Sequence, residues 1–244
     1  MAGEERTYRR WIESDLRTFE VRVGESDLLI SAERPLRAVA ERALRALRAE
    51  LEGYLERDPE FERALKPRKP REGAPEIVRE MAEAAEACGV GPMAAVAGAT
   101  AQAVGRTLLR ESEQVIVENG GDIFLQTKGP RVAAIYAGAS PLSGKVGVRI
   151  SRVGQSLGLC TSSGTVGPSL SFGKADAAIV VAESAARADA AATALGNRVQ
   201  TAEDIGPALV WLKGIADMLG GALVVGETLG AWGEVELVRL GAEE

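Results

Sequence analysis

Five short β-rich segments crowd into the middle of the chain, and they constrain its fold more than any other feature. They span residues 114–118, 122–126, 131–136, 145–150 and 157–161. Because so few residues separate them, tight turns and antiparallel pairing are expected. Helical patterns are clustered before and after this block rather than alternating with each strand. The sequence therefore predicts an α+β fold, with mixed or antiparallel sheets packed against helices.

The flanking segments complete this picture. Residues 17–31 read as a β-hairpin around Gly24-Glu25-Ser26, and a long amphipathic helix follows from Pro35 to Asp58-Pro59. Further helices are predicted at 75–88, 92–109, 185–195 and 203–219, and further strands at 177–181, 223–225 and 235–240. A single domain is expected over 1–244, with an N-terminal hairpin and helix (1–65), a loop (66–74) and a core that carries the site (75–244).

The chain contains no histidine. This excludes Ser-His-Asp and Cys-His nucleophiles and HExxH zinc sites. Acid–base chemistry must then use Asp, Glu, Lys, Tyr or Cys. Any bound metal is expected to be a hard cation with oxygen ligands, Mg²⁺ before Zn²⁺.

Charge and composition limit the kinds of partner that this chain is expected to bind. A net charge of −6 disfavours nucleic acid, and the basic run from Lys66 to Arg71 is predicted to be a solvated connector, with a docking patch as the alternative. The two cysteines are far apart, and neither a signal peptide nor a membrane-length apolar stretch is visible, so a cytoplasmic protein with no membrane partner is expected. The Ala- and Gly-rich helices suit the seam of a homo-oligomer as well as a core.

Asp189 and Thr193 are the candidate metal ligands. On a helix, residues four apart share a face, so this carboxylate and hydroxyl can hold one Mg²⁺ together, with phosphates and water as the other ligands. The alternative is that Asp189 pairs with Arg187 or caps a nearby backbone group, and that Thr193 only packs.

Asn119-Gly120-Gly121-Asp122 is a second candidate element. A glycine pair within a strand pattern indicates a close approach of ligand or backbone, and Asp122 could take a ribose hydroxyl, a base edge or a proton. A plain hairpin turn explains the same residues equally well.

A small-polar loop follows the strand that ends near Cys160. Thr161, Ser162, Ser163, Gly164 and Thr165 offer hydroxyl and N–H donors of the kind that bind anions, although an ordinary polar loop is the alternative. Lys174 and Asp176 are further candidate contacts to phosphate or ribose. Ser171 and Lys174 match SxxK, but the companion KTG and SDN motifs are missing and the motif leads into a strand, so we set it aside.

Cys160 has two interpretations. It is either a small buried apolar residue or a reactive thiol activated by backbone N–H groups or Lys174. If the thiol is reactive, Cys160 is a candidate catalytic residue. Asp122 is the other candidate, as a general base.

Taken together, these segments resemble the ApbE superfamily, the FAD:protein FMN transferases. The strings VGPMAAVAGA, VENGGDIF, YAGASPLS, CTSSGTVG, SFGKADA and ADAAATALGN are similar to an uncharacterised cytoplasmic branch of it. The resemblance implies an ApbE-like fold, Mg²⁺ at Asp189 and Thr193, a flavin-nucleotide contact at Asp122 and a pyrophosphate near the serine loop. The transferases also carry a HxxDPxTG-type segment that holds FAD, and this chain lacks it.

The resulting functional hypothesis is a protein that binds FAD, FMN or a related phosphorylated ligand with Mg²⁺. Transfer of FMN or a phosphoryl group to a protein acceptor is the activity that this would support. Two alternatives stay open: a sulfur carrier or accessory factor that uses Cys160, and a nucleotide-binding module without catalysis.

Overall fold

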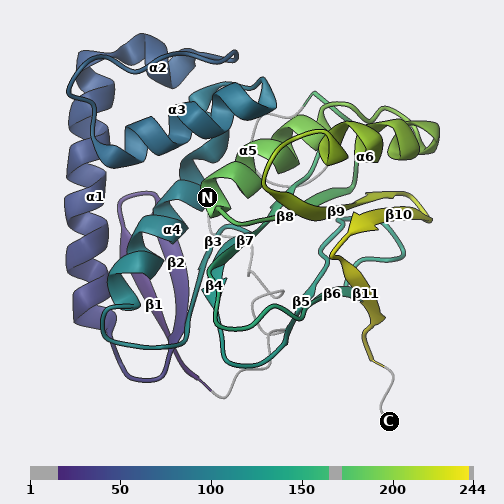
Figure 1. Ribbon diagram of the computed structural model, residues 1–244, viewed down its shortest axis with the longest axis horizontal. Coiled ribbons are helices and arrows are strands. Elements are labelled where there is room, and N and C mark those ends of the chain that lie inside the picture. The colour runs from purple at the N-terminus through teal and green to yellow at the C-terminus, as the bar shows by residue number, and fades with distance from the viewer. Residues whose placement is uncertain (1–15, 165–171, 242–244) are drawn as a thin grey trace.

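The computed structural model describes residues 16–164 and 172–241, and its elements form three layers (Figure 1). Helices cover one face of a large sheet, and a small sheet lies on its opposite face. Thr165 and Ser171 lie outside the described residues. The mixed helix and antiparallel-sheet architecture confirms the predicted fold class.

The helices of the described chain are α1 (Arg37–Arg57), α2 (Pro59–Arg63), α3 (Glu76–Cys88), α4 (Val96–Leu108), α5 (Ala185–Gly196) and α6 (Ile205–Lys213), with 3₁₀ turns at Pro92–Ala95 and Ala202–Asp204. The strands are β1 (Arg17–Val23), β2 (Ser26–Ala32), β3 (Val115–Asn119), β4 (Asp122–Gln126), β5 (Arg131–Ala134), β6 (Val146–Ile150), β7 (Leu157–Ser162), β8 (Ala177–Ala182), β9 (Met218–Val225), β10 (Thr228–Gly233) and β11 (Glu236–Arg239).

Within the described residues, eight strands form the large sheet in the order β1-β2-β3-β4-β7-β8-β9-β10. Each neighbouring pair is antiparallel. The chain leaves this sheet after β4 to form β5 and β6, which pair with β11 in the small sheet, and it returns at β7. This excursion makes β4 and β7 neighbours, which later brings Asp122 beside Thr161.

The two faces of the large sheet bury different side chains. Phe124 and Cys160 belong to the apolar cluster under the helices, whereas Ile123 and Leu159 belong to the cluster shared with the small sheet. Both faces of a central strand are therefore apolar, which explains why β8 is a continuous run of buried residues.

The last third of the chain departs from the sequence prediction. The helix expected to reach residue 219 ends at Lys213, β9 begins at Met218, and β10 was not predicted. After the helix ends, Asp217 takes a φ of 67° and turns the chain directly into β9. Gly220 and Gly221 weaken the strand pattern, yet the sheet needs them, because a Cβ at Gly220 would lie 2.7 Å from the carbonyl oxygen of Trp232.

The basic run is largely exposed, as predicted for a solvated connector, but two of its arginines are fastened to a buried carboxylate. Arg68 and Arg71 form ion pairs at 3.2 and 3.3 Å with Asp58, a fully buried carboxylate at the end of α1. This loop thus ties α1 to the segment that leads into α3. No single described helix is long and apolar enough to cross a membrane, and α3 with residues 92–108 passes that test only as a pair bent by 104°.

Candidate functional site

The turn between β3 and β4 places Asp122 at the site. Asn119 and Asp122 face each other across it, and Gly120 and Gly121 take φ values of 67° and 109°, a region that side chains disfavour. The Asn119 side-chain amide donates to the carbonyl of Ala97 at 3.2 Å, which fastens the turn to the start of α4. Asp122 then begins β4 on the face that the helices cover.

The Asp122 carboxylate is buried between β4 and β7. Its Oδ1 accepts the backbone N–H of Thr161 at 3.3 Å. Burial raises the pKa of Asp122 to about 7, although hydrogen bonds from Cys160 and Thr161 oppose this, and the charge of Glu118 raises it further. A carboxyl group that titrates near neutrality can serve as a general base.

Asp189 reaches the same region from α5. Its Oδ2 accepts the backbone N–H of Gly98, at the start of α4, at 2.8 Å. Burial raises the pKa of Asp189 well above the usual range, and the charge of Asp122 adds to this, while N–H groups of Gly98 and Ala97 act in the opposite direction. The structure therefore brings together the two acidic residues that the sequence singled out.

This pair of carboxylates has no cationic partner in the described part of the chain. No lysine or arginine there contributes to the pKa of either group. Two buried carboxylates without a counter-charge are unfavourable when both are ionised, and a hard cation with oxygen ligands would relieve that cost. The donor set fits Mg²⁺ on these grounds.

Thr193 lies one turn after Asp189 on α5 and is half-buried. Its position on the same helical face agrees with joint ligation, because residues four apart project together. The residues described contain no cluster of three or more His, Cys, Asp or Glu side chains suited to a metal. A cation here would accordingly rely on hydroxyl, backbone, water and ligand oxygens besides its carboxylates.

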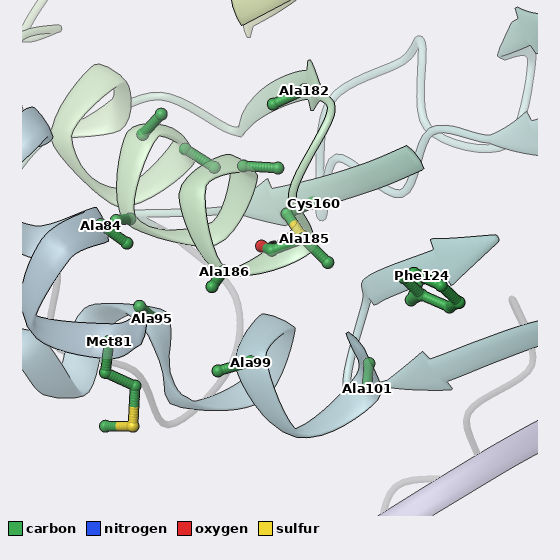
Figure 2. Packing of buried hydrophobic residues seen from close by; sticks show 14 of the residues in the cluster. Met81, Ala84, Ala95, Ala99, Ala101, Phe124, Cys160, Ala182, Ala185 and Ala186 are labelled. Carbon is green, nitrogen blue, oxygen red and sulfur yellow. Dashed lines mark hydrogen bonds between the residues drawn. The ribbon is translucent and has the colours of Figure 1, made fainter. Parts of the chain in front are cut away.

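Cys160 is fully buried on β7, beneath the first turn of α5 (Figure 2). Its thiol contacts the carbonyl oxygen of Ala185, and burial together with the charges of Asp122 and Asp189 raises its pKa well above the usual value. These surroundings disfavour a thiolate, in contrast to the activated thiol of the second interpretation. Cys88 is also buried, and desolvation raises its pKa to about 11.

The small-polar loop continues from the strand that carries Cys160. Thr161 and Ser162 end β7, and Ser163 and Gly164 follow, with the N–H of Gly164 donating to the carbonyl of Ala175 at 2.9 Å. This puts the described part of the loop directly beyond the Asp122 contact.

Lys174 and Asp176 lie further along the same region. Lys174 is exposed, and its backbone N–H donates to the carbonyl of Val199 at 2.7 Å. The Asp176 carboxylate accepts the N–H of Gly226 at 2.7 Å and so holds the turn between β9 and β10. Lys174 therefore keeps an exposed side chain, whereas the Asp176 carboxylate serves a structural turn.

The close packing of α4 and α5 depends on residues that the sequence did not mark. A Cβ at Gly98 would lie 2.2 Å from the carbonyl oxygen of Ala185, so only glycine allows the two helices to approach this closely. Figure 2 shows the small side chains Ala99 and Ala186 at this crossing. Gln102, buried on α4, was also missed; a single amide in an Ala- and Gly-rich helix was the available signal.

A cavity of about 390 Å³ lies elsewhere, between the end of β6 and the β10–β11 connection. Its charged residues are paired with one another, Arg152 with Glu234 at 2.6 Å and Arg149 with Glu236 at 3.3 Å. This cavity offers no unpaired charge to a ligand and is separate from the acidic pair.

The fold is that of the ApbE flavin transferases. The structure resembles a mutant of the flavin transferase ApbE from Vibrio cholerae, with a TM-score of 0.58 and 12% identity over 90% of this chain and 97% of that one. It also resembles the apo form of the flavinyl transferase ApbE from Pseudomonas stutzeri, with a TM-score of 0.53 and 14% identity over 89% and 94% of the two chains. At these identities the likeness concerns the fold.

Sequence comparison assigns the chain to a particular family within this fold. A family model described as "AbpE bacteria" matches residues 9–210, and the chain belongs to this family. A UPF0280 protein from Methanocella arvoryzae is 40% identical, with 91% of each chain covered. A UPF0280 protein from Methanosarcina barkeri is 45% identical over 82% of this chain and 79% of the relative. The resemblance drawn from the sequence motifs is thereby confirmed.

Proposed function

We propose that this protein binds a flavin nucleotide, or a related phosphorylated ligand, beside the acidic pair Asp122 and Asp189, together with Mg²⁺ held by Asp189 and Thr193. One observation carries the proposal: two carboxylates from β4 and α5 are buried in one place, and no cationic side chain of the described chain balances them. Magnesium is commonly held by one or two carboxylates with substrate phosphates and water, which suits this arrangement.

Each residue has a role in this proposal. Asp189 and Thr193 hold the cation, and the N–H of Gly98 keeps one Asp189 oxygen in place. Asp122 contacts the nucleotide and acts as a general base, which its pKa of about 7 suits. The bound Mg²⁺ would supply neutralisation of charge on the phosphates.

The loop after β7 supplies the phosphate contacts. Thr161, Ser162, Ser163 and Gly164 present hydroxyl and backbone groups next to Asp122, and Lys174 adds a positive charge. The flavin is proposed because the solved structures with this fold are named as flavin transferases. Transfer of FMN to a protein acceptor, in the cytoplasm and without nucleic-acid or membrane partners, is the corresponding activity.

Titration of the purified protein with FAD, FMN and ADP tests this, with flavin fluorescence and calorimetry as readouts, in Mg²⁺ and in excess chelator. We expect binding in Mg²⁺ and its loss in chelator. Asp189→Asn and Thr193→Val should weaken the Mg²⁺-dependent binding, whereas Asp217→Asn, at an exposed ion pair with Arg187, should not. Equal affinity in all variants, or in chelator, would refute the proposal.

The geometry gives no comparable support to the sulfur-carrier alternative, because the Cys160 thiol is buried against carboxylates. Binding without any turnover in the presence of acceptor proteins would favour the non-catalytic module instead.

A further inference from the structure

Helices α4 and α5 exchange side-chain hydrogen bonds to each other's backbone. Asp189 of α5 accepts the N–H of Gly98 on α4 at 2.8 Å, and Gln102 of α4 accepts the N–H of Ala185, the first residue of α5, at 2.8 Å. Gly98 and Gln102 are four residues apart, as are Ala185 and Asp189, so each helix contributes two positions from one face. The two helices are thus joined by two reciprocal bonds, one turn apart.

The orientation of the Gln102 amide is determined by its other partner. Its Nε2 donates to the Glu80 carboxylate on α3 at 3.0 Å. A carboxylate only accepts and a backbone N–H only donates, so a flipped amide would lose both bonds. Glu80 in turn is paired with Arg106. The chain Arg106–Glu80–Gln102 therefore presents one oxygen to the N-terminus of α5.

Burial makes this oxygen important. Gln102 is 2% exposed, and without it the Ala185 N–H would lie in the interior with no replacement from water. Ala185 also cannot shift freely, because a Cβ at Gly98 or Gly158 would already lie 2.2 or 2.3 Å from its atoms. The start of α5 is consequently held between α4 and β7, with Gln102 as its polar anchor.

We propose that Gln102 is a positioning residue for the candidate metal site: its amide sets where α5 begins, and thereby holds Asp189 against Gly98 and beside Asp122. This inference rests on the proposed function, because it assigns to Gln102 the alignment of a ligand of that site. Gln102 forms no hydrogen bond with the carboxylate of Asp122 or Asp189, and it acts on the site through the position of α5.

The test uses a charge swap. Gln102→Leu removes both bonds, and Gln102→Glu opposes two carboxylates at Glu80. The double variant Glu80→Gln with Gln102→Glu keeps an acceptor for Ala185 and restores a donor–acceptor pair between α3 and α4, with reversed polarity. Gln155→Leu, in an exposed loop, is the matched control.

Two readouts separate the inference from the proposed function. The first is NMR of the metal-free protein, in which the amide shift and hydrogen-exchange protection of Gly98 report whether Asp189 is in place. We expect the amide shift and protection of Gly98 in both single variants to approach the values seen in Asp189→Asn. In the double variant they should return to the wild-type values. The second is calorimetric titration with Mg²⁺ alone, where we expect binding about tenfold weaker in the single variants, as loss of a buried hydrogen bond implies, and recovery in the double variant.

An unchanged Gly98 amide in a folded single variant, or no recovery in the double variant, would overturn the positioning role. If the Gly98 readout behaves as expected but wild-type protein binds no Mg²⁺, then the proposed function fails while the positioning of Asp189 stands. If Gln102→Leu does not fold, the positioning role is tested by comparing the Gly98 amide and the Mg²⁺ affinity of Gln102→Glu with those of the double variant.

Discussion

The sulfur of Cys160 lies 3.4 Å from the carbonyl oxygen of Ala185 and so links the sheet to the first turn of α5. The carbonyl belongs to the same residue whose N–H is held by Gln102. Cys160 is thus part of the packing that places α5, and its side chain is fully buried.

We therefore predict slow alkylation of Cys160 by iodoacetamide at neutral pH. Burial and the nearby carboxylates raise its pKa, so little thiolate exists, and the reagent cannot reach the sulfur without local opening. The rate is measured by mass spectrometry in a Cys88→Ala background, with the urea-unfolded protein as the reference for an accessible thiol. Rapid alkylation of the folded protein would instead favour the alternative hypothesis of a sulfur carrier.

Gly98→Ala should destabilise the protein by about 1–3 kcal/mol, the usual range for overpacking. The added methyl would meet the carbonyl oxygen of Ala185 at 2.2 Å and the Cβ of Asp189 at 2.8 Å, so α4 and α5 would have to separate. Urea unfolding monitored by circular dichroism gives the difference. We also expect loss of Mg²⁺ binding, because Asp189 would move with α5.

Gly53→Ala is the matched control for that change. Gly53 lies within α1, and a Cβ there would meet nothing within 4 Å. Alanine has the higher helix propensity, so a gain of up to about 1 kcal/mol is expected. Similar losses in the two variants would show that the close approach of α4 and α5 is not what requires glycine at residue 98.

Most helices and strands could be predicted because residue spacing and turn residues are set by contacts between near neighbours in sequence. The α1 helix and the β1–β2 hairpin follow from spacing and turn residues, and both were expected within a few residues of their observed bounds. β10 was missed because Gly230 and Gly233 break its pattern, and the reason for Gly230 is a neighbour distant in sequence: a Cβ there would lie 2.4 Å from the side chain of Ile205.

The candidate site shows the same division. The shared face of Asp189 and Thr193 is a property of one helix and could be predicted. The bond from Gly98 to Asp189 joins residues 91 positions apart, and the excursion through β5 and β6 brings β7 beside β4. The small residues of α4 and its single buried amide are visible in the sequence, but the partners that give Gly98 and Gln102 their roles are distant in sequence and appear only in three dimensions.

Asp58→Ala should cost about 1–3 kcal/mol in unfolding free energy, as expected for removing a buried carboxylate that accepts hydrogen bonds from charged groups. The Asp58 carboxylate is fully buried and is contacted by Arg68, Arg71 and the hydroxyl of Tyr54. Its loss would leave the basic run without its anchor. Limited trypsin digestion should then cleave within residues 66–71 faster than in the wild type.

Glu60→Ala is the control, because Glu60 pairs with the same Arg68 at 2.7 Å but is exposed. Exposed ion pairs contribute at most about 1 kcal/mol, so this variant should unfold almost as the wild type does. An equally large loss in both variants would mean that the surface pair, rather than the buried carboxylate, fastens the loop.

The metal-free protein should lose stability as the pH rises from about 4 to about 7, relative to Asp122→Asn. The pKa of Asp122 is raised from 3.8 to about 7 by burial, so between these values the folded state holds a proton that the unfolded state has released. Protonation stabilises the folded form on the acid side, and that contribution is fully lost once the pH exceeds the folded pKa.

Other carboxylates must be considered in this comparison. The pKa of Asp189 is also raised and acts in the same direction, so the Asp122→Asn variant should flatten the slope of stability against pH without abolishing it. The pKa of Glu33 is lowered from 4.5 to about 2 by hydrogen bonds from the Lys128 side chain and the Glu113 backbone, so its contribution is lost as the pH falls below about 4.5; it is the same in both proteins and cancels in the comparison. Urea midpoints measured across the range provide the check, with Asp217→Asn as an exposed control. Equal slopes in wild type and Asp122→Asn would show that Asp122 titrates as an ordinary carboxylate and would remove it as a general base.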